Sequence, residues 1–239
     1  MKTVAVIQAR MGSTRLPRKA MMPLAGEPLT FHVIQRALAI RRADEVVLAV
    51  PDTPADEQLV ELARTLGVRA VRGSEEDVLS RFRLALEGTG ADVVVRICAD
   101  APLFDPEHVD RAVDALIEHD ADLVRWEPPA QTAYQGAGVI SKRALDWTWD
   151  TARDDPLAFE HVTAYARRHA GELKTVPIRP EPEMIGDFHL SIDTAADLAA
   201  MQQVYERLYR PGRIVPLRDA VDLIRRGVVV FPARTGVRP

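Results

Sequence analysis

The sequence has very little cysteine and no long apolar segment. Cys98 is the only cysteine among 239 residues, which excludes a disulfide within the chain and makes a cysteine-based metal cluster implausible. No apolar run approaches the ~20 residues that a membrane-spanning helix requires. The first residues lead into an apolar segment without the charged, apolar and small-residue pattern of a secretion signal. We therefore expect a cytoplasmic protein with no membrane association.

An excess of one charge sign is also absent. The net charge is −4, with 28% charged and 47% apolar residues, which is ordinary for a globular protein and argues against non-specific nucleic-acid binding. Repeats and low-complexity linkers are absent as well. A chain of this length can build one large α/β core or two small domains. We expect a single domain spanning residues 1–239.

The apolar pattern predicts strands that alternate with helices. The expected strands are 4–7, 45–50, 68–72, 91–97, 121–126, 135–140 and 189–192, and the expected helices are 28–41, 54–66, 74–86, 106–117, 142–151, 160–169, 195–208 and 216–226. This alternation indicates a doubly wound α/β fold, with a mostly parallel sheet and helices on both faces. The right-handed crossover rule places the loops after the first, third and fourth strands at one edge. A smaller β-containing excursion is expected in the second half.

A basic loop follows the first strand. Within ten residues it holds four cations, Arg10, Arg15, Arg18 and Lys19, beside Gly12 and Ser13. Ligands bind in open α/β sheets where such loops leave the carboxyl ends of strands. Cations and backbone N–H groups there suit a polyphosphate. The alternative is a set of solvated surface charges, which the position at a strand end disfavours.

Two common phosphate motifs are missing from this loop. Pro17 stands where a P-loop needs its second glycine, and Gly12 alone cannot form the dinucleotide fingerprint G-x-G-x-x-G. The loop is therefore a phosphate-binding candidate of a third kind.

Several acidic and hydroxyl residues have both a structural and a functional interpretation. Ser74 is expected to cap a helix with Asp77 three residues later, and Asp105 is expected to cap the helix after Pro106. Asp100 has no such duty, and a carboxylate past the end of a central strand suits a Mg²⁺ ligand that faces phosphates. Either Asp193 or Thr194 can cap the helix that follows them.

Five segments, in this order, resemble the cytidylyltransferase family that includes the spore-coat polysaccharide cytidylyltransferase-like proteins. They are IQARMGSTRLPRK, GSEEDVL, RICADAPL, EHVT and SIDTAADL. The resemblance runs from Val4 to about Leu208 and extends to enzymes that make CMP-activated acidic sugars. This chain departs from the family's R-L-P-G-K motif by carrying Arg18 in place of the glycine.

The resemblance implies an enzyme that transfers CMP from CTP to an anionic sugar or phosphorylated acceptor and releases pyrophosphate. It implies Mg²⁺ as the cofactor and a role in making precursors of surface polysaccharides or glycoconjugates. The excursion in the second half is then expected to help form the acceptor site and a homodimer interface.

The resemblance and the residue patterns together give a set of candidate site residues. The catalytic candidates are Arg10, Lys19 and Asp100, and the metal candidates are Asp100 and Asp193. The nucleotide-binding candidates are Ala9, Arg10, Met11, Gly12, Ser13, Arg15, Lys19, Arg72, Gly73, Ser74 and Arg96, and the acceptor-side candidates are Glu160 and His161. A strand arginine such as Arg96 can instead pair with a carboxylate, and a lone Glu-His pair is most often structural.

Arg18 motivates a rival hypothesis. A long side chain in place of glycine could block the close approach of backbone and phosphate, which would leave a nucleotide-binding module without catalysis. Within enzymes, a transferase of the same fold could use another nucleotide or consume a nucleotide sugar. Lys19, Asp100 and Asp193 favour catalysis, because a pure binding module needs no pair of metal carboxylates.

Overall fold

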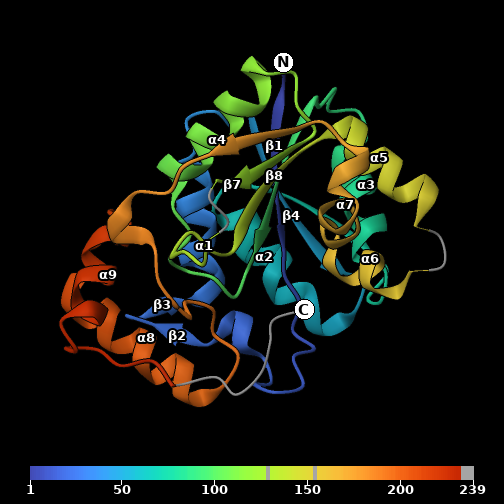
Figure 1. The fold of residues 1–239 in the computed structure, drawn as a ribbon. Coiled ribbons are helices and arrows are strands. Elements are labelled where there is room, and N and C mark those ends of the chain that lie inside the picture. Colours follow the sequence, from blue (N-terminus) through green and yellow to red (C-terminus); the bar gives the residue numbers. More distant parts are fainter. Residues whose placement is uncertain (128–129, 153–154, 233–239) are drawn as a thin grey trace.

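A seven-stranded sheet forms the centre of the computed structural model, which describes residues 1–127, 130–152 and 155–232 (Figure 1). In spatial order the strands are β5 (Arg69–Gly73), β4 (Glu45–Pro51), β1 (Thr3–Gln8), β6 (Val93–Cys98), β8 (Ala137–Ser141), β7 (Leu123–Trp126) and β9 (Thr175–Ile178). The first four run parallel, β8 is antiparallel to β6, and β9 is parallel to β7. The predicted mostly parallel sheet is confirmed.

Helices cover both faces of this sheet (Figure 1). One face packs against α1 (Leu29–Leu38), α2 (Glu57–Thr65) and α4 (Pro106–Glu118). The other packs against α3 (Val78–Leu86), α5 (Lys142–Thr151), α6 (Pro156–His161) and α7 (Ala164–Arg168). The sequence of β1 explains the two layers, since Ala5 and Ile7 face one core while Val4 and Val6 face the other.

A third apolar cluster lies beside the sheet, at the lower left of Figure 1. It packs α8 (Ala195–Leu208) and α9 (Leu217–Arg225) against the hairpin of β2 (Pro23–Leu24) and β3 (Glu27–Pro28). The buried Arg36 of α1 joins this cluster to the sheet, because Nε donates to Phe104 O at 2.6 Å and Nη1 donates to Val215 O at 2.6 Å. Across the three described ranges, no helix combines the length and apolar character that crossing a membrane requires.

The sheet splits between β7 and β8. These strands share only the pair Leu123 and Ile140, whereas β7 forms four residue pairs with β9 and β8 forms five with β6. Gly136 holds β8 close to the end of β6, since its carbonyl accepts from Cys98 N at 2.8 Å. A Cβ on Gly136, which has φ +83°, would lie 2.1 Å from the Ala101 Cβ. β8 therefore stays paired with β6, while β7 and its partner β9 separate from β8 beyond the single pair of Leu123 and Ile140.

Two predicted elements in the second half are wrong. Residues 189–192 form no strand, because Leu190 N donates to the Gln135 side chain and Ile192 N donates to Asp100 O, which leaves no ladder. The predicted helix 160–169 is two helices, because Val162 takes a φ of +47° between α6 and α7. The sequence analysis also did not anticipate β9.

The predicted start of α3 is wrong by three residues. Its N-cap is Asp77, whose carboxylate accepts from Ser80 N at 2.8 Å, while Ser74 lies before the helix and its Oγ accepts from Asp77 N. Asp105 does cap α4 as expected, by accepting from Glu107 N at 2.9 Å. Ser74 is therefore part of a turn that precedes the helix.

Candidate active site

The Lys19 ammonium lies between two carboxylates that are distant in sequence. Its Nζ donates to Asp100 Oδ2 at 3.0 Å and to Asp193 Oδ1 at 3.3 Å, and also to Ile192 O at 2.8 Å. The side chain of Asp193 is 8% exposed and that of Asp100 is 31% exposed. The loops after β1 and β6 and the segment before α8 therefore meet at one point.

The segment before α8 explains why Asp193 is available at this point. Thr194 is the N-cap of α8 and forms a capping box with Asp197. The Asp197 carboxylate also accepts from Asp193 N at 3.0 Å. Because Thr194 caps the helix, the Asp193 carboxylate accepts instead from Lys19 and from Arg15 Nη2 at 2.9 Å. Of the two residues that could have capped α8, Thr194 does so.

The basic loop is folded by its own backbone and by a buried acid. Met11 N donates to Asp56 Oδ1 at 2.8 Å, and Met11 O accepts from Ser13 N and from Arg18 N. Asp56 is itself oriented by Thr53, whose hydroxyl donates to its other oxygen at 2.6 Å. The loop is thus held in shape while Arg10 and the polar groups near it remain accessible.

Ala9 and Gly12 line this loop in different ways. Ala9 is buried, and its N–H continues the β1 ladder by donating to Ala49 O. A Cβ on Gly12 would meet the Glu75 carboxylate at 2.7 Å. The loops after β1 and β5 therefore touch at Gly12, where a larger side chain would not fit without displacing Glu75.

Arg18 adopts the left-handed conformation with φ +60° and ψ +21°. This is the region that glycine enters most easily. Its side chain is exposed, and Nη2 donates to Gln58 Oε1 at 3.1 Å on α2. This hydrogen bond directs the Arg18 side chain toward α2 and not toward Asp100 and Asp193.

Two arginines lie at the turn after β5, one in surface ion pairs and one buried. Arg72 forms ion pairs with Glu57 and Asp52. Arg81 is buried and donates to the carbonyls of Ser74 and Glu75. Burial, and after it the charge of Arg10, lowers the pKa of Arg81 to about 10. The Gly73 carbonyl accepts from Asp52 N at 2.8 Å. The buried Arg81 therefore holds the backbone of this turn in place, close to Arg10 of the basic loop.

An open groove of about 630 Å³ lies beside β6 and contains Arg96, His161 and Arg167. Arg96 Nε donates to Gln8 Oε1 at 3.0 Å, which places it next to the end of β1. Desolvation, and after it the charge of Arg96, lowers the pKa of Arg167. Within the described ranges neither guanidinium has a carboxylate partner. The groove thus presents two neighbouring positive charges to a ligand.

The two acceptor-side candidates lie differently with respect to this groove. His161 lines it at the end of α6, whereas Glu160 is exposed on α6 and does not line it. Arg167 was missed by the sequence analysis. The signal was present but weak, because Gly138 leaves the space that the Arg167 guanidinium fills, with Nη2 2.8 Å from where a Cβ would lie.

The donor set at Lys19 suits a hard cation. Asp100 and Asp193 supply carboxylate oxygens, which Mg²⁺ prefers, and Mg²⁺ usually binds through one or two carboxylates with phosphates and water. Across the described ranges, this site included, no group of three or more His, Cys, Asp or Glu side chains could hold a metal, so Asp100 and Asp193 would act as a two-carboxylate set. The lysine ammonium shows that a positive charge is stable between the two carboxylates.

Comparison with known proteins gives one consistent family. The family model for cytidylyltransferases matches residues 4–209. The spore coat polysaccharide biosynthesis protein SpsF of Bacillus subtilis is 32% identical over 227 residues, covering 92% of this chain and 93% of the relative. A 3-deoxy-manno-octulosonate cytidylyltransferase of Chloroherpeton thalassium is 37% identical over 123 residues, covering 51% of this chain and 48% of the relative.

Solved structures show the same fold. A cytidylyltransferase from Leptospira borgpetersenii has a TM-score of 0.87 at 23% identity and covers 100% of both chains. A CMP:2-keto-3-deoxy-manno-octonic acid synthetase complexed with CTP has a TM-score of 0.67 at 19% identity, covering 87% of this chain and 99% of that one.

Proposed function

The chain belongs to the cytidylyltransferase family, and we propose that it transfers CMP from CTP to an anionic sugar or phosphorylated acceptor. The acceptor oxygen forms a bond to the α-phosphorus, the bond between the α-phosphorus and the bridging oxygen breaks, and pyrophosphate leaves. The similarity to SpsF supports a product that serves as a precursor of a surface polysaccharide. Such a reaction depends on positioning and charge neutralisation.

The loop after β1 is the proposed triphosphate site. Arg10 is exposed on this loop, and Arg15 and Lys19 already bind a carboxylate, Asp193. Phosphate oxygens form the same charge-assisted hydrogen bonds with Arg and Lys as carboxylates do. In this proposal the three cations hold the leaving pyrophosphate, and the backbone N–H groups near Gly12 and Ser13 bind phosphate oxygens. The turn at Arg72, Gly73 and Ser74 contacts the base.

Asp100 and Asp193 are the proposed ligands of the divalent cation. When bound, Mg²⁺ would supply charge neutralisation at the phosphates. The protein's part is to fix both carboxylates before substrate arrives. Ile192 N donates to Asp100 O at 2.8 Å, and Asp197 holds the Asp193 backbone. Before the cation binds, the Lys19 ammonium lies between the two carboxylates, and its positive charge offsets their mutual repulsion.

The groove beside β6 is the proposed acceptor site. Arg96 and Arg167 line it without carboxylate partners among the described residues, so an acceptor carboxylate or phosphate would neutralise them. This assigns Arg96 to the acceptor side, together with His161. Among the described residues near the site, no side chain stands out as a general base, and an acceptor oxygen of low pKa would need little help.

The convergence of Lys19, Asp100 and Asp193 is the observation that carries this proposal. A pyrophosphate-release screen with CTP, UTP, ATP and GTP against acidic sugars and phosphorylated alcohols tests it. We expect release with CTP and an anionic acceptor only, abolished by EDTA. Release with another nucleotide in preference to CTP would contradict the proposed substrate.

The rival hypothesis of a non-catalytic module loses its motivation in this geometry. Arg18 donates to Gln58 on α2 and is exposed, so it does not occupy the space between Lys19 and the two carboxylates. A chain that binds CTP by calorimetry yet releases no pyrophosphate with any acceptor would revive that rival.

A further inference from the structure

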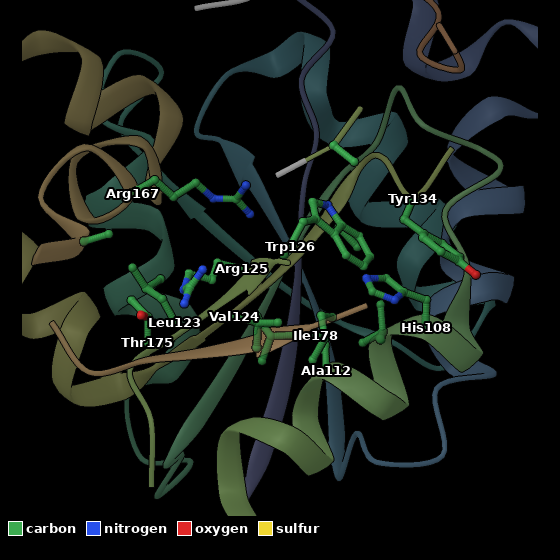
Figure 2. Close-up of a pocket in the computed structure, with 16 residues that line it drawn as sticks. His108, Ala112, Leu123, Val124, Arg125, Trp126, Tyr134, Arg167, Thr175 and Ile178 are labelled. Carbon is green, nitrogen blue, oxygen red and sulfur yellow. The ribbon is translucent and has the colours of Figure 1, made fainter. Parts of the chain in front are cut away.

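A cavity of about 370 Å³ lies in the split between β7 and β8 (Figure 2). At one end His108 stacks on Trp126 and Tyr134, with ring centroids 4.9 and 4.2 Å away, and Arg167 lies at the opposite end. The cavity shares Trp126, Tyr134 and Arg167 with the groove beside β6, so it is an extension of the proposed acceptor site. A buried carboxylate to which the proposed reaction gives no part lies instead on the nucleotide side.

This carboxylate belongs to Asp56, which is 2% exposed and ends the short helix Pro54–Asp56 before α2. Both of its oxygens accept hydrogen bonds, Oδ1 from Met11 N at 2.8 Å and Oδ2 from the Thr53 hydroxyl at 2.6 Å. In the part of the chain that the structure describes, its side chain makes no capping hydrogen bond to α2. Helix capping therefore does not account for burying a charge here, which is costly unless the charge is well satisfied.

The turn after β5 approaches Asp56 from a second direction. Arg81 holds this turn, because its Nη1 donates to Ser74 O and, at 3.1 Å, to Glu75 O. Burial, and after it the charge of Arg10, lowers the pKa of Arg81 to about 10, and the Asp56 carboxylate is the strongest influence in the opposite direction. Asp56 therefore lies near the guanidinium that holds the turn and also accepts a hydrogen bond from the basic loop.

The basic loop and the turn after β5 leave little room between them. A Cβ on Gly12 would lie 2.7 Å from Glu75 Oε1. Met11, the neighbour of Gly12, is the residue whose N–H donates to Asp56. Asp56 thus holds the loop next to the point where it meets the turn. A ligand that contacts both segments depends on their spacing, since a misplacement of 1 Å can cost about 10²-fold in rate.

We propose that Asp56 is a positioning residue for the nucleotide, which through its hydrogen bond to Met11 N sets the spacing between the basic loop and the turn after β5. One CTP molecule can then place its triphosphate on the loop and its base on the turn. This inference rests on the proposed function, since it concerns the CTP site of that reaction. It goes further by giving a role to a buried side chain that acts through the backbone of the loop.

The alternative role for Asp56 is to stabilise the fold alone, and the two roles predict different binding. A positioning role predicts a selective loss, because each segment keeps bonds of its own. Met11 O still accepts from Ser13 N and Arg18 N in the loop, and Arg81 still holds the turn. Each segment can then bind its part of the nucleotide, whereas a ligand that spans both loses the advantage of joining the parts.

Calorimetry with CTP, cytidine and tripolyphosphate, each with Mg²⁺, tests this role. For Asp56→Ala we expect CTP affinity at least tenfold weaker, with the affinities for cytidine and tripolyphosphate within twofold of the wild-type protein. Asp56→Asn should bind CTP within threefold of the wild-type protein, because its amide oxygen can accept from Met11 N while its amide nitrogen donates to the Thr53 hydroxyl. Unchanged CTP affinity in Asp56→Ala, an equal loss for all three ligands, or an Asn variant as weak as the Ala variant would overturn the proposal.

Two further variants complete the test. Thr53→Val removes the hydroxyl that orients Asp56 and leaves the loop sequence intact, so it decides the matter if Asp56→Ala does not fold. It should bind CTP at least threefold more weakly and both fragments normally, and wild-type CTP affinity in this variant would contradict the positioning role. Asp114→Ala is the matched control, since Asp114 is about half exposed in a surface ion pair with Arg42, and it should bind all three ligands as the wild-type protein does.

Turnover separates this inference from the proposed function. If CTP affinity falls selectively in Asp56→Ala while even the wild-type protein releases no pyrophosphate, the positioning role stands and the proposed reaction fails. If the wild-type protein releases pyrophosphate and Asp56→Ala binds CTP equally well, the reaction stands and the positioning role fails. A wild-type protein that does not bind CTP would overturn both.

Discussion

The two sides of the candidate site differ in how their charges are balanced. On the proposed nucleotide side, Lys19 and Arg15 are paired with Asp100 and Asp193, and the groups contact one another within 3.3 Å. On the acceptor side, Arg167 faces an open groove without a carboxylate partner among the described residues. The charges of the first side are neutralised by the protein itself, whereas the Arg167 charge of the second side is not neutralised by any described carboxylate.

This difference indicates how each side is stabilised before substrate arrives. On the proposed nucleotide side, the backbones that carry the two carboxylates are hydrogen-bonded, Asp100 O to Ile192 N and Asp193 N to the Asp197 carboxylate of the α8 capping box. On the proposed acceptor side, burial, and after it the charge of Arg96, lowers the pKa of Arg167, and the sheet itself has separated between β7 and β8. We therefore expect substitutions on the first side to affect turnover and those on the second to affect acceptor choice.

The largest expected effect comes from removing one carboxylate on the nucleotide side. Asp100→Asn or Asp193→Asn should lower kcat by roughly 10²–10³, as losing one preorganised electrostatic group does in other enzymes. The proposed cation loses a charged ligand in either variant. Pyrophosphate release measures turnover, and thermal melting checks that the fold is kept.

Asp114→Asn is the matched control, because Asp114 is about half exposed in a surface ion pair with Arg42. Its kcat should not change, since such pairs contribute little. Full activity of either Asn variant at the site would remove that residue from the proposed metal site.

The nucleotide side could be largely anticipated from the sequence, and the reason is local. Val4 to Ile7 is a continuous apolar strand, and the cations follow it within a dozen residues. Asp100 follows the next central strand of the sheet. The meeting of Asp193 with Asp100 was inferred from the family resemblance and not from spacing, because no local pattern joins residues 93 positions apart.

The acceptor side could not be anticipated in the same way. Its shape depends on β7 and β8 separating after one residue pair, and on the break at Val162 between α6 and α7. Val162 has no residue-level signal for a positive φ, since β-branched residues rarely take it. Arg167 then reaches the groove from a helix whose sequence reads as an ordinary surface helix.

The stability of the acceptor side should depend on His108 as the pH changes. Burial holds the pKa of His108 at about 4, below its ordinary value of 6.5, so the unfolded chain takes up this proton first as the pH falls. Above pH 6.5 the titration of His108 therefore does not change the free energy of unfolding. Between pH 6.5 and 4 it lowers the free energy of unfolding by up to about 3 kcal/mol.

His108→Phe keeps the stacking on Trp126 and Tyr134 but removes this titration. Urea unfolding at pH 7.5 and 4.5 should show a smaller loss of stability in the variant than in the wild-type protein, by about 2–3 kcal/mol. The same loss in both proteins would mean that His108 is as easily protonated in the folded chain as in the unfolded one.

A weaker effect is expected for Arg167, which has no carboxylate partner among the described residues of the groove. Arg167→Met keeps the length of the side chain and removes its charge, so the KM for the anionic acceptor should rise about tenfold, as expected for the loss of one charged hydrogen bond. The KM for CTP and the melting temperature should not change. A rise in the KM for CTP instead would place Arg167 on the nucleotide side and remove the contrast between the two sides.

The smallest effect concerns Arg18, on the outer edge of the nucleotide side. Loop flexibility alone would make Arg18→Gly less stable by roughly 0.5–1 kcal/mol. The φ of +60° reverses the expected sign of this stability change, because the left-handed region destabilises an L-residue by about 1–2 kcal/mol and does not destabilise glycine. The loss from loop flexibility and the gain from the left-handed conformation oppose each other, so we expect the Arg18→Gly variant to be more stable than the wild-type protein by about 0.5 kcal/mol.

Arg18→Ala is the control for the glycine variant, since alanine keeps the Cβ and loses the hydrogen bond to Gln58. Glycine should therefore exceed alanine by about 1 kcal/mol in urea unfolding, with unchanged kcat in both variants. A glycine variant less stable than the alanine variant would show that the left-handed conformation imposes no strain here, and a changed kcat would show that Arg18 contacts the substrate.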